Sequence, residues 1–126
     1  TSDKAKKSRE LVFELLLADQ PERDVAHDNN SHFWNWIDKV DVKENRFPKK
    51  TPCQPDSSHP SMAVNLDACI QCNLCVRACR EVQVNDVICM AYRGENSKIV
   101  FDVDGAMGDS SCVECGECGQ ACPTGA

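Results

Sequence analysis

The chain has 126 residues, and ten of them are cysteine, whereas aromatic residues make up only 6%. A chain of this length buries limited apolar surface, so cysteine chemistry is expected to help hold it together. The net charge is −6, and the acidic excess falls entirely in residues 51–126, which carry ten acidic and four basic side chains. This charge argues against nucleic-acid binding, and the lack of an 18-residue apolar run argues against a membrane span.

Two helices are predicted in the first 46 residues, which form a helical arm. Residues 1–20 carry apolar side chains at helical spacing, which predicts a helix that is buried over much of its surface and ends before Pro21. Ser8 is a candidate N-cap of this helix. A second, shorter helix is predicted from apolar side chains at positions i, i+3, i+4 and i+7. These are Phe33, Trp36, Ile37 and Val40.

A proline-rich stretch divides the rest of the chain. Residues 47–60 contain four prolines and are expected to form a linker, followed by a domain at residues 61–126. In that domain residues 62–66 are expected to form a short strand. Residues 87–92 and 98–104 are expected to pair as a hairpin around a turn that contains Gly94.

One internal repeat dominates this domain. The spacing Cys-x2-Cys-x2-Cys-x3-Cys occurs twice, beginning at Cys69 and at Cys112. It is typical of bacterial ferredoxins, in which three cysteines of a run bind one cubane cluster and the fourth binds the other cluster. The spacing therefore predicts an α+β, two-[4Fe–4S] ferredoxin-like domain. The predicted ligands are Cys69, Cys72, Cys75 and Cys122 for cluster 1, and Cys112, Cys115, Cys118 and Cys79 for cluster 2.

Two other uses of these cysteines stay open. Two zinc sites would also need four thiolates each, although zinc ligand pairs are usually separated by longer spacers. A disulfide framework would require an oxidising compartment, for which the sequence gives no export signal.

The remaining candidate residues favour structural roles. Cys89, inside a predicted strand, is expected to be a small buried hydrophobe, and Cys53 to be a free thiol. His27 and His32 are expected to be solvated, His59 to be a turn residue, and the carboxylates of Glu114 and Glu117 to keep their loop soluble. No catalytic acid–base pair, nucleophile or phosphate-binding loop is present in the sequence, so no catalytic residue is predicted.

Residues 59–126 resemble the alpha subunit of cytoplasmic, NAD-dependent, molybdenum- or tungsten-containing formate dehydrogenases, and more distantly the large iron–sulfur subunit of NADH dehydrogenase. The likeness is carried by residues 62–72, 76–88, 99–102, 107–110 and 118–126. It implies cytoplasmic electron transfer between a pterin metal site and a flavin/NAD module, and these parts of the complex are the expected partners. The alternatives are a free-standing ferredoxin-type carrier and, from another class, a structural zinc module for assembly.

Residues 9–21 also resemble this family, in which a following segment binds a further [4Fe–4S] cluster through one His and three Cys. This sequence departs from the family at all four ligands, so no cluster is expected there. The residues at those positions are Gln20, Asp24, His27 and Phe33. The family's alpha subunit continues into a pterin-binding region, so the chain is expected to be either a fragment of such a subunit or a separate relative of its ferredoxin part.

Overall fold

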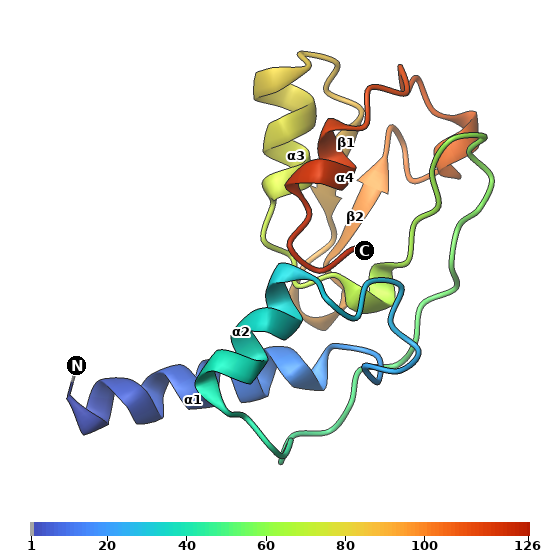
Figure 1. Cartoon of the computed structure of the whole chain (residues 1–126). Coiled ribbons are helices and arrows are strands. Elements are labelled where there is room, and N and C mark those ends of the chain that lie inside the picture. The colour runs from blue at the N-terminus through green and yellow to red at the C-terminus, as the bar shows by residue number, and fades with distance from the viewer. Residues whose placement is uncertain (1) are drawn as a thin grey trace. The chain divides into compact units, whose positions relative to one another are not determined.

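The computed structural model describes residues 2–126 (Figure 1). The chain forms two compact units. The first unit comprises the chain through Pro52 together with Asp67–Ile70 and Pro123–Gly125, and the second comprises Cys53–Leu66, Gln71–Cys122 and Ala126. None of the helices within residues 2–126 combines the length and apolar character that crossing a bilayer requires.

Helix α1 of the first unit spans Asp3–Ala18 and begins earlier than expected. The Ser2 hydroxyl accepts a hydrogen bond from the Ala5 N–H at 3.3 Å, so Ser2 is the N-cap and the prediction of Ser8 is wrong. The physical reason is that residues 4–7, which are Lys and Ala, are strong helix formers and extend the helix toward the N-terminus. As expected, α1 ends before Pro21.

Much of the apolar stripe of α1 faces solvent, so the prediction of a largely buried helix is wrong. The side chain that is buried in mid-helix is Glu14. The Arg46 guanidinium donates to its two carboxylate oxygens at 2.6 and 2.8 Å, and these bonds lower the pKa of Glu14. A charged pair therefore forms at this position, while Phe13, Leu16 and Leu17 of α1 are partly buried against the apolar core. The exposed fractions of Leu11, Val12 and Leu15 are 41%, 53% and 46%.

Helix α2 spans His32–Val40 and supplies the core of the first unit. Phe33 and Ile37 are buried as expected, but the buried tryptophan is Trp34, whereas Trp36 remains 47% exposed. The Trp36 ring instead stacks on Phe13 of α1, with 6.2 Å between ring centroids. The buried face of α2 is thus rotated by part of a turn from the face expected from the spacing.

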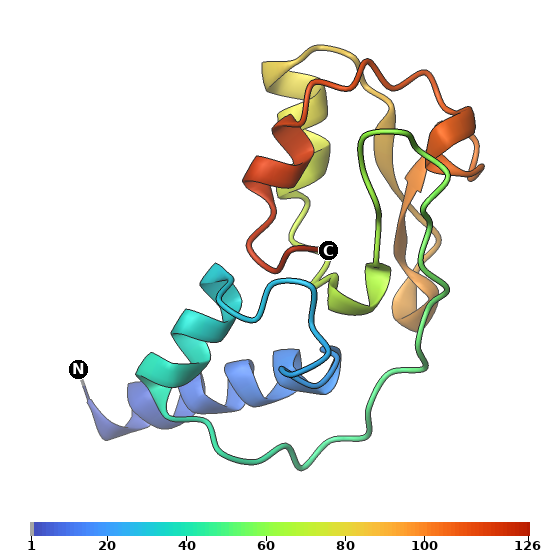
Figure 2. The same cartoon turned by 45° about the vertical axis from the view of Figure 1, so that its right-hand side comes forward.

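The second unit contains a hairpin and two short helices (Figure 2). Strands β1, Ile88–Ala91, and β2, Lys98–Phe101, are antiparallel, with Ile88 opposite Phe101 at the open end. The predicted hairpin is confirmed with shorter strands. Helix α3, Leu74–Arg77, continues into a π-helical turn at Ala78–Val82 and packs against helix α4, Glu117–Ala121.

Residues 56–64, which precede the first cysteine run, are hydrogen-bonded within this unit without forming a strand. The strand predicted at residues 62–66 is wrong, because Val64 makes only an isolated bridge with Asp56, with both N–H···O distances at 2.8 Å. The Asp56 carboxylate also accepts hydrogen bonds from the N–H groups of Met107 at 2.7 Å and Ser58 at 2.9 Å. Residues 56–64, partly within the stretch expected to be a linker, therefore contact the loop that leads to the second cysteine run.

Candidate metal centre

The two cysteine runs share one backbone geometry. Gln71 and Asn73 in the first run have φ of 56° and 63°, and the equivalent residues of the second run, Glu114 and Gly116, have φ of 57° and 77°. A helix begins directly after the second of these residues in each run, α3 after Asn73 and α4 after Gly116. The sequence repeat is therefore also a repeat of structure, in which two left-handed residues turn each loop before its helix.

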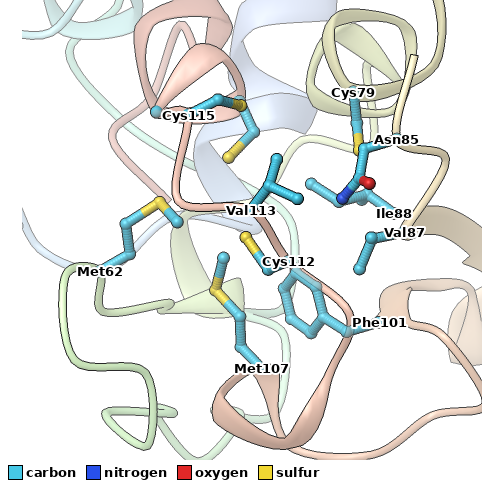
Figure 3. Close-up of a pocket in the computed structure, with 12 residues that line it drawn as sticks. Met62, Cys79, Asn85, Val87, Ile88, Phe101, Met107, Cys112, Val113 and Cys115 are labelled. Atoms are coloured by element: carbon cyan, nitrogen blue, oxygen red, sulfur yellow. The ribbon is translucent and has the colours of Figure 1, made fainter. Parts of the chain in front are cut away.

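The four cysteines predicted for cluster 2 line a single hollow in the second unit (Figure 3). Cys112, Cys115 and Cys118 come from the second loop and the start of α4, whereas Cys79 comes from the π-helical turn that follows α3. The structure thus brings a cysteine of the first run together with three of the second. Apolar side chains complete the wall of the hollow. They are Met62, Val87, Ile88, Val113, Phe101 and Met107.

Asn85 joins the two segments that carry these cysteines. Its backbone N–H donates to the Cys79 carbonyl at 3.0 Å, and its side-chain amide donates to the Ser111 carbonyl at 3.0 Å. Ser111 directly precedes Cys112, so Asn85 links the turn that holds Cys79 to the start of the second loop. Sequence reasoning missed this residue, because a contact between residues 26 positions apart leaves no periodic signal.

The Asp102 carboxylate also holds Ser111, the residue directly before the second loop. The Asp102 side chain accepts hydrogen bonds from the Ser111 N–H at 2.8 Å and from the Ser111 hydroxyl at 3.1 Å. Asp102 lies just after β2 with φ of 47°, so the end of the hairpin is attached to the residue before Cys112. Several bonds from different segments therefore fix where the second loop begins.

The thiols in the hollow form an electrostatically crowded group. Burial raises the pKa of the Cys118 thiol, and the nearby Cys112 and Cys115 raise it further. Thiolates bind metals, so a cation is needed to hold several of them together. The Glu114 N–H donates to the Cys112 sulfur at 3.4 Å, a contact of the kind that tunes cluster sulfurs.

The donor set fits an iron–sulfur cubane. Among residues 2–126 no three His, Cys, Asp or Glu side chains converge where a single metal ion could sit. A cubane requires no such convergence, because each of its four thiolates binds a different iron atom. No disulfide links any of the ten cysteines, all of which lie in the described part of the chain.

The ligands predicted for cluster 1 have different surroundings. Cys72 is exposed, Cys75 is half-buried in α3, and Cys122 is half-buried directly after α4. Cys69 lies in Asp67–Ile70, which groups with the first unit. Their common role remains a prediction from the sequence.

Two of the four positions at which the family's further cluster would be bound are buried and hydrogen-bonded here. Gln20, which is 4% exposed, donates from its side-chain amide to the Ala68 carbonyl at 2.8 Å. Phe33 is buried, and its backbone N–H donates to the Pro123 carbonyl at 3.0 Å. The other two positions, Asp24 and His27, are exposed. This segment therefore contacts peptides on either side of predicted cluster 1 ligands, since Ala68 precedes Cys69 and Pro123 follows Cys122.

Within residues 2–126, the residues that line the cysteine hollow include none of the other candidate residues. Cys89 is half-buried in β1 opposite Val100, and Cys53 is half-buried. His59 is buried in a turn, where its Nδ1 accepts a hydrogen bond from the Ser61 N–H at 3.2 Å. Glu114 is exposed and accepts a hydrogen bond from the Ser61 hydroxyl at 2.9 Å, whereas Glu117 is half-buried and His32 is exposed.

Comparison with known proteins gives three findings. Residues 68–126 match the family model described as the 4Fe-4S dicluster domain. The chain is 32% identical over 93 residues to "Probable oxidoreductase YjgC" of Bacillus subtilis (strain 168), and 33% identical over 92 residues to a protein of Staphylococcus haemolyticus (strain JCSC1435) named "Putative formate dehydrogenase". Each alignment covers 73% of this chain, and the chain spans about 9% of the length of either relative.

The third finding is a likeness of fold. An NAD+-reducing [NiFe]-hydrogenase, crystallised in the H2-reduced state, matches with a TM-score of 0.84 and 22% sequence identity. The match covers 100% of this chain and 55% of the hydrogenase chain.

Proposed function

Because residues 68–126 match the 4Fe-4S dicluster domain, we propose that this chain holds two [4Fe–4S] clusters and relays single electrons within a formate-dehydrogenase-like oxidoreductase. The family match confirms the α+β ferredoxin-like fold and the iron–sulfur chemistry expected from the sequence. The similarity to the two curated relatives confirms the predicted resemblance to formate dehydrogenases.

The observation that carries the proposal is the shared hollow of Cys79, Cys112, Cys115 and Cys118. Three ligands from one run and the fourth from the other is the exchange expected when two clusters are bound by interleaved runs. By the repeat, Cys69, Cys72, Cys75 and Cys122 would hold the other cluster. Residues 61–126 are then the cluster domain, residues 1–46 the helical arm and residues 47–60 the linker.

The protein's own residues have defined tasks in this relay. The eight thiolates bind the irons, the apolar wall around cluster 2 limits water, and backbone N–H groups such as that of Glu114 donate to sulfur. Each cluster, when bound, would supply a one-electron redox centre. The proposed partners are a pterin-binding catalytic part and a flavin/NAD part.

The exposed apolar side of α1 supports a place in a larger assembly over a freely diffusing carrier. Leu11, Val12 and Leu15 retain 41% to 53% of their surface in contact with solvent. A carrier that dissociates from its partners gains nothing from a contiguous apolar helix face, whereas a subunit or domain can bury such a face against its neighbour.

The test is metal analysis of the chain produced and purified without oxygen. The proposal predicts about eight iron and eight sulfide per chain, and electron paramagnetic resonance signals from two interacting reduced clusters. Zinc without sulfide would instead establish a structural zinc module. About four iron and four sulfide in fully folded protein would contradict the two-cluster assignment.

Size-exclusion chromatography of the loaded chain addresses the choice between carrier and complex. The proposal predicts self-association or binding to other parts of the oxidoreductase through the exposed face of α1. A strictly monomeric chain that passes electrons to several unrelated acceptors at comparable rates would favour the free-standing carrier.

A further inference from the structure

The residue before the first cysteine of each run makes the same kind of hydrogen bond. The Ala68 carbonyl, directly before Cys69, accepts from the side-chain amide of Gln20 at 2.8 Å. The Ser111 carbonyl, directly before Cys112, accepts from the side-chain amide of Asn85 at 3.0 Å. Neither amide belongs to a cysteine run, and each lies within the same compact unit as the carbonyl to which it donates.

The two amides reach these carbonyls from unrelated parts of the chain. Gln20 follows the end of α1 and is 48 residues from Ala68, whereas Asn85 follows the π-helical turn and is 26 residues from Ser111. The two runs therefore do not owe this bond to their shared sequence. Two different segments supply the same group to the same position of the repeat.

A planar peptide makes this bond relevant to the clusters. The carbonyl of the residue before a cysteine and the N–H of that cysteine belong to one rigid peptide unit, and no peptide bond in residues 2–126 is cis. Holding the Ala68 or Ser111 carbonyl therefore fixes the direction of the N–H of Cys69 or Cys112. It also fixes the Cα from which the first thiolate of each loop extends.

Each amide has further anchors that make it a rigid donor. Gln20 is 4% exposed, and its backbone N–H donates to the Leu17 carbonyl at the end of α1 at 3.2 Å. Asn85 is half-buried, lines the hollow of cluster 2, and donates from its backbone to Cys79, a ligand in that same hollow. Ala68 is buried, so its carbonyl would be left unsatisfied without its partner, which favours rotation of its peptide. Ser111 is exposed, so water can replace the Asn85 amide as the donor there, but the bond that directs this peptide toward the Cys79 segment is removed.

We infer that Gln20 and Asn85 are paired positioning residues, each of which orients the first cysteine peptide of one cluster-binding loop. Gln20 acts on the loop of cluster 1 and Asn85 on the loop of cluster 2. The inference rests on the proposed function, because it requires that both clusters are bound. The segment around Gln20 lacks the four ligands of the family's further cluster. In this role it supports a neighbouring cluster loop by hydrogen bonding instead of ligating a cluster itself.

The experiment measures both clusters in each of two variants. Gln20→Met and Asn85→Leu remove the amide donor and keep a side chain of similar size. Each loaded variant is examined for the midpoint potential of each cluster and for the rate at which each cluster releases iron to a chelator. The matched controls are Gln54→Met and Asn29→Leu, which alter exposed carboxamides. Signals are assigned by comparison with Cys79→Ala, which is expected to lose the signal of cluster 2 and keep that of cluster 1.

The inference predicts that each variant affects one cluster and leaves the other unchanged. Gln20→Met should shift the potential of cluster 1 and speed its iron release about tenfold, while leaving release from cluster 2 within about twofold of the wild type. Asn85→Leu should do the reverse, and the controls should change neither cluster. A purely structural role in folding would not move the potential of one cluster alone.

Other outcomes separate this inference from the proposed function. If both variants keep both potentials and release rates, the positioning role is wrong and the two-cluster function stands. If the wild type holds no iron, the proposed function itself fails. Should Gln20→Met lose both clusters, the milder Gln20→Asn decides, since it keeps the amide and shortens its reach: selective lability of cluster 1 supports the inference, and equal loss of both contradicts it.

Discussion

The two cysteine loops of this chain have the same backbone and opposite charge. Both turn through two left-handed residues and lead into a helix. Residues 69–79 nevertheless contain one arginine and no carboxylate, whereas residues 112–122 contain two glutamates and no basic residue. Cysteine spacing therefore specifies the path of the loop, while the residues between the cysteines would set the electrostatic surroundings of a bound cluster.

Cys79→Ala is expected to have the largest effect, because it tests whether the two loops exchange ligands. The variant removes a cysteine of the first run, yet the hollow places that cysteine with the second. We expect loss of cluster 2, or its conversion to a three-iron form, with the cluster 1 signal retained in the resonance spectrum of the reduced protein. Cys89→Ala, in β1, is the control and should retain both clusters. Loss confined to cluster 1 would refute the exchange.

The left-handed residue before each helix gives the next largest effect. Gly116→Ala places a Cβ at φ of 77°, where no atom lies within 4 Å, so its cost is backbone strain alone, about 1 kcal/mol. Asn73→Ala at φ of 63° should cost less, because asparagine already carries a Cβ there. Both should lower the midpoint of anaerobic thermal unfolding.

Gly119→Ala is the control of opposite sign for this pair. Gly119 lies within α4, and an added Cβ meets nothing within 4 Å. Alanine should therefore stabilise the helix by about 0.5–1 kcal/mol. If Gly116→Ala proved as stabilising as Gly119→Ala, the left-handed turn would not be a requirement of the second loop.

The negative charge of the second loop is expected to lower the reduction potential of cluster 2. Glu114→Gln removes a negative charge from the second loop and keeps an oxygen that can accept the bond from the Ser61 hydroxyl. The potential of cluster 2 should rise, on the order of tens of millivolts, because reduction adds negative charge beside one carboxylate fewer. Potentiometric titration followed by resonance spectroscopy measures the shift.

Glu95→Gln provides the matched control for this charge. Glu95 is exposed in the hairpin turn, at the opposite end of the strands from Ile88 and Phe101, which line the hollow. Its removal should leave the potential of cluster 2 nearly unchanged. An equal shift in both variants would show that net charge, and not the charge of the loop, governs the potential.

Another effect on folding stability, this one dependent on pH, is expected from the Asp56 carboxylate, which accepts hydrogen bonds near the start of the second loop. Hydrogen bonds from the Met107 N–H and then from Ser58 lower the pKa of Asp56. The ionised form is thus favoured in the folded state, so its contribution is present above the unfolded carboxyl pKa of about 3.9 and is lost as the pH falls through the lowered value. Asp56→Asn should cost about 1 kcal/mol at neutral pH, and this difference should shrink in acid.

Acid unfolding followed by circular dichroism tests this dependence on pH. Asp109→Asn, at an exposed carboxyl in the same approach, is the control and should unfold with the wild type. A difference between Asp56→Asn and the wild type that stayed constant from neutral pH to pH 3 would mean that the charge of Asp56 is not what holds Met107.

Periodicity was sufficient to predict the helices α1 and α2 and the hairpin, and the spacing of the cysteines was sufficient to predict the two similar loops. They could not predict which face of a helix is buried: Trp34 rather than Trp36 is buried in α2, because the position of α1 decides which residues of α2 lie inside. They also did not predict the hydrogen bonds made by the side chains of Gln20 and Asn85. Each donates from a side chain to a distant backbone carbonyl, and such a bond needs no particular residue at the acceptor and so leaves no pattern in the sequence.

The helix and π-helical turn that follow the first loop have a consequence for electron transfer between the two proposed clusters. Cys75 and Cys79 are one helical turn apart, a rise of about 6 Å along the axis, and the proposed assignment gives them to different inorganic centres. The gap between donor and acceptor is then set by a single hydrogen-bonded stretch of main chain. Hinge motions elsewhere in the molecule would leave the internal hop unchanged and would affect only the steps by which charge enters and leaves.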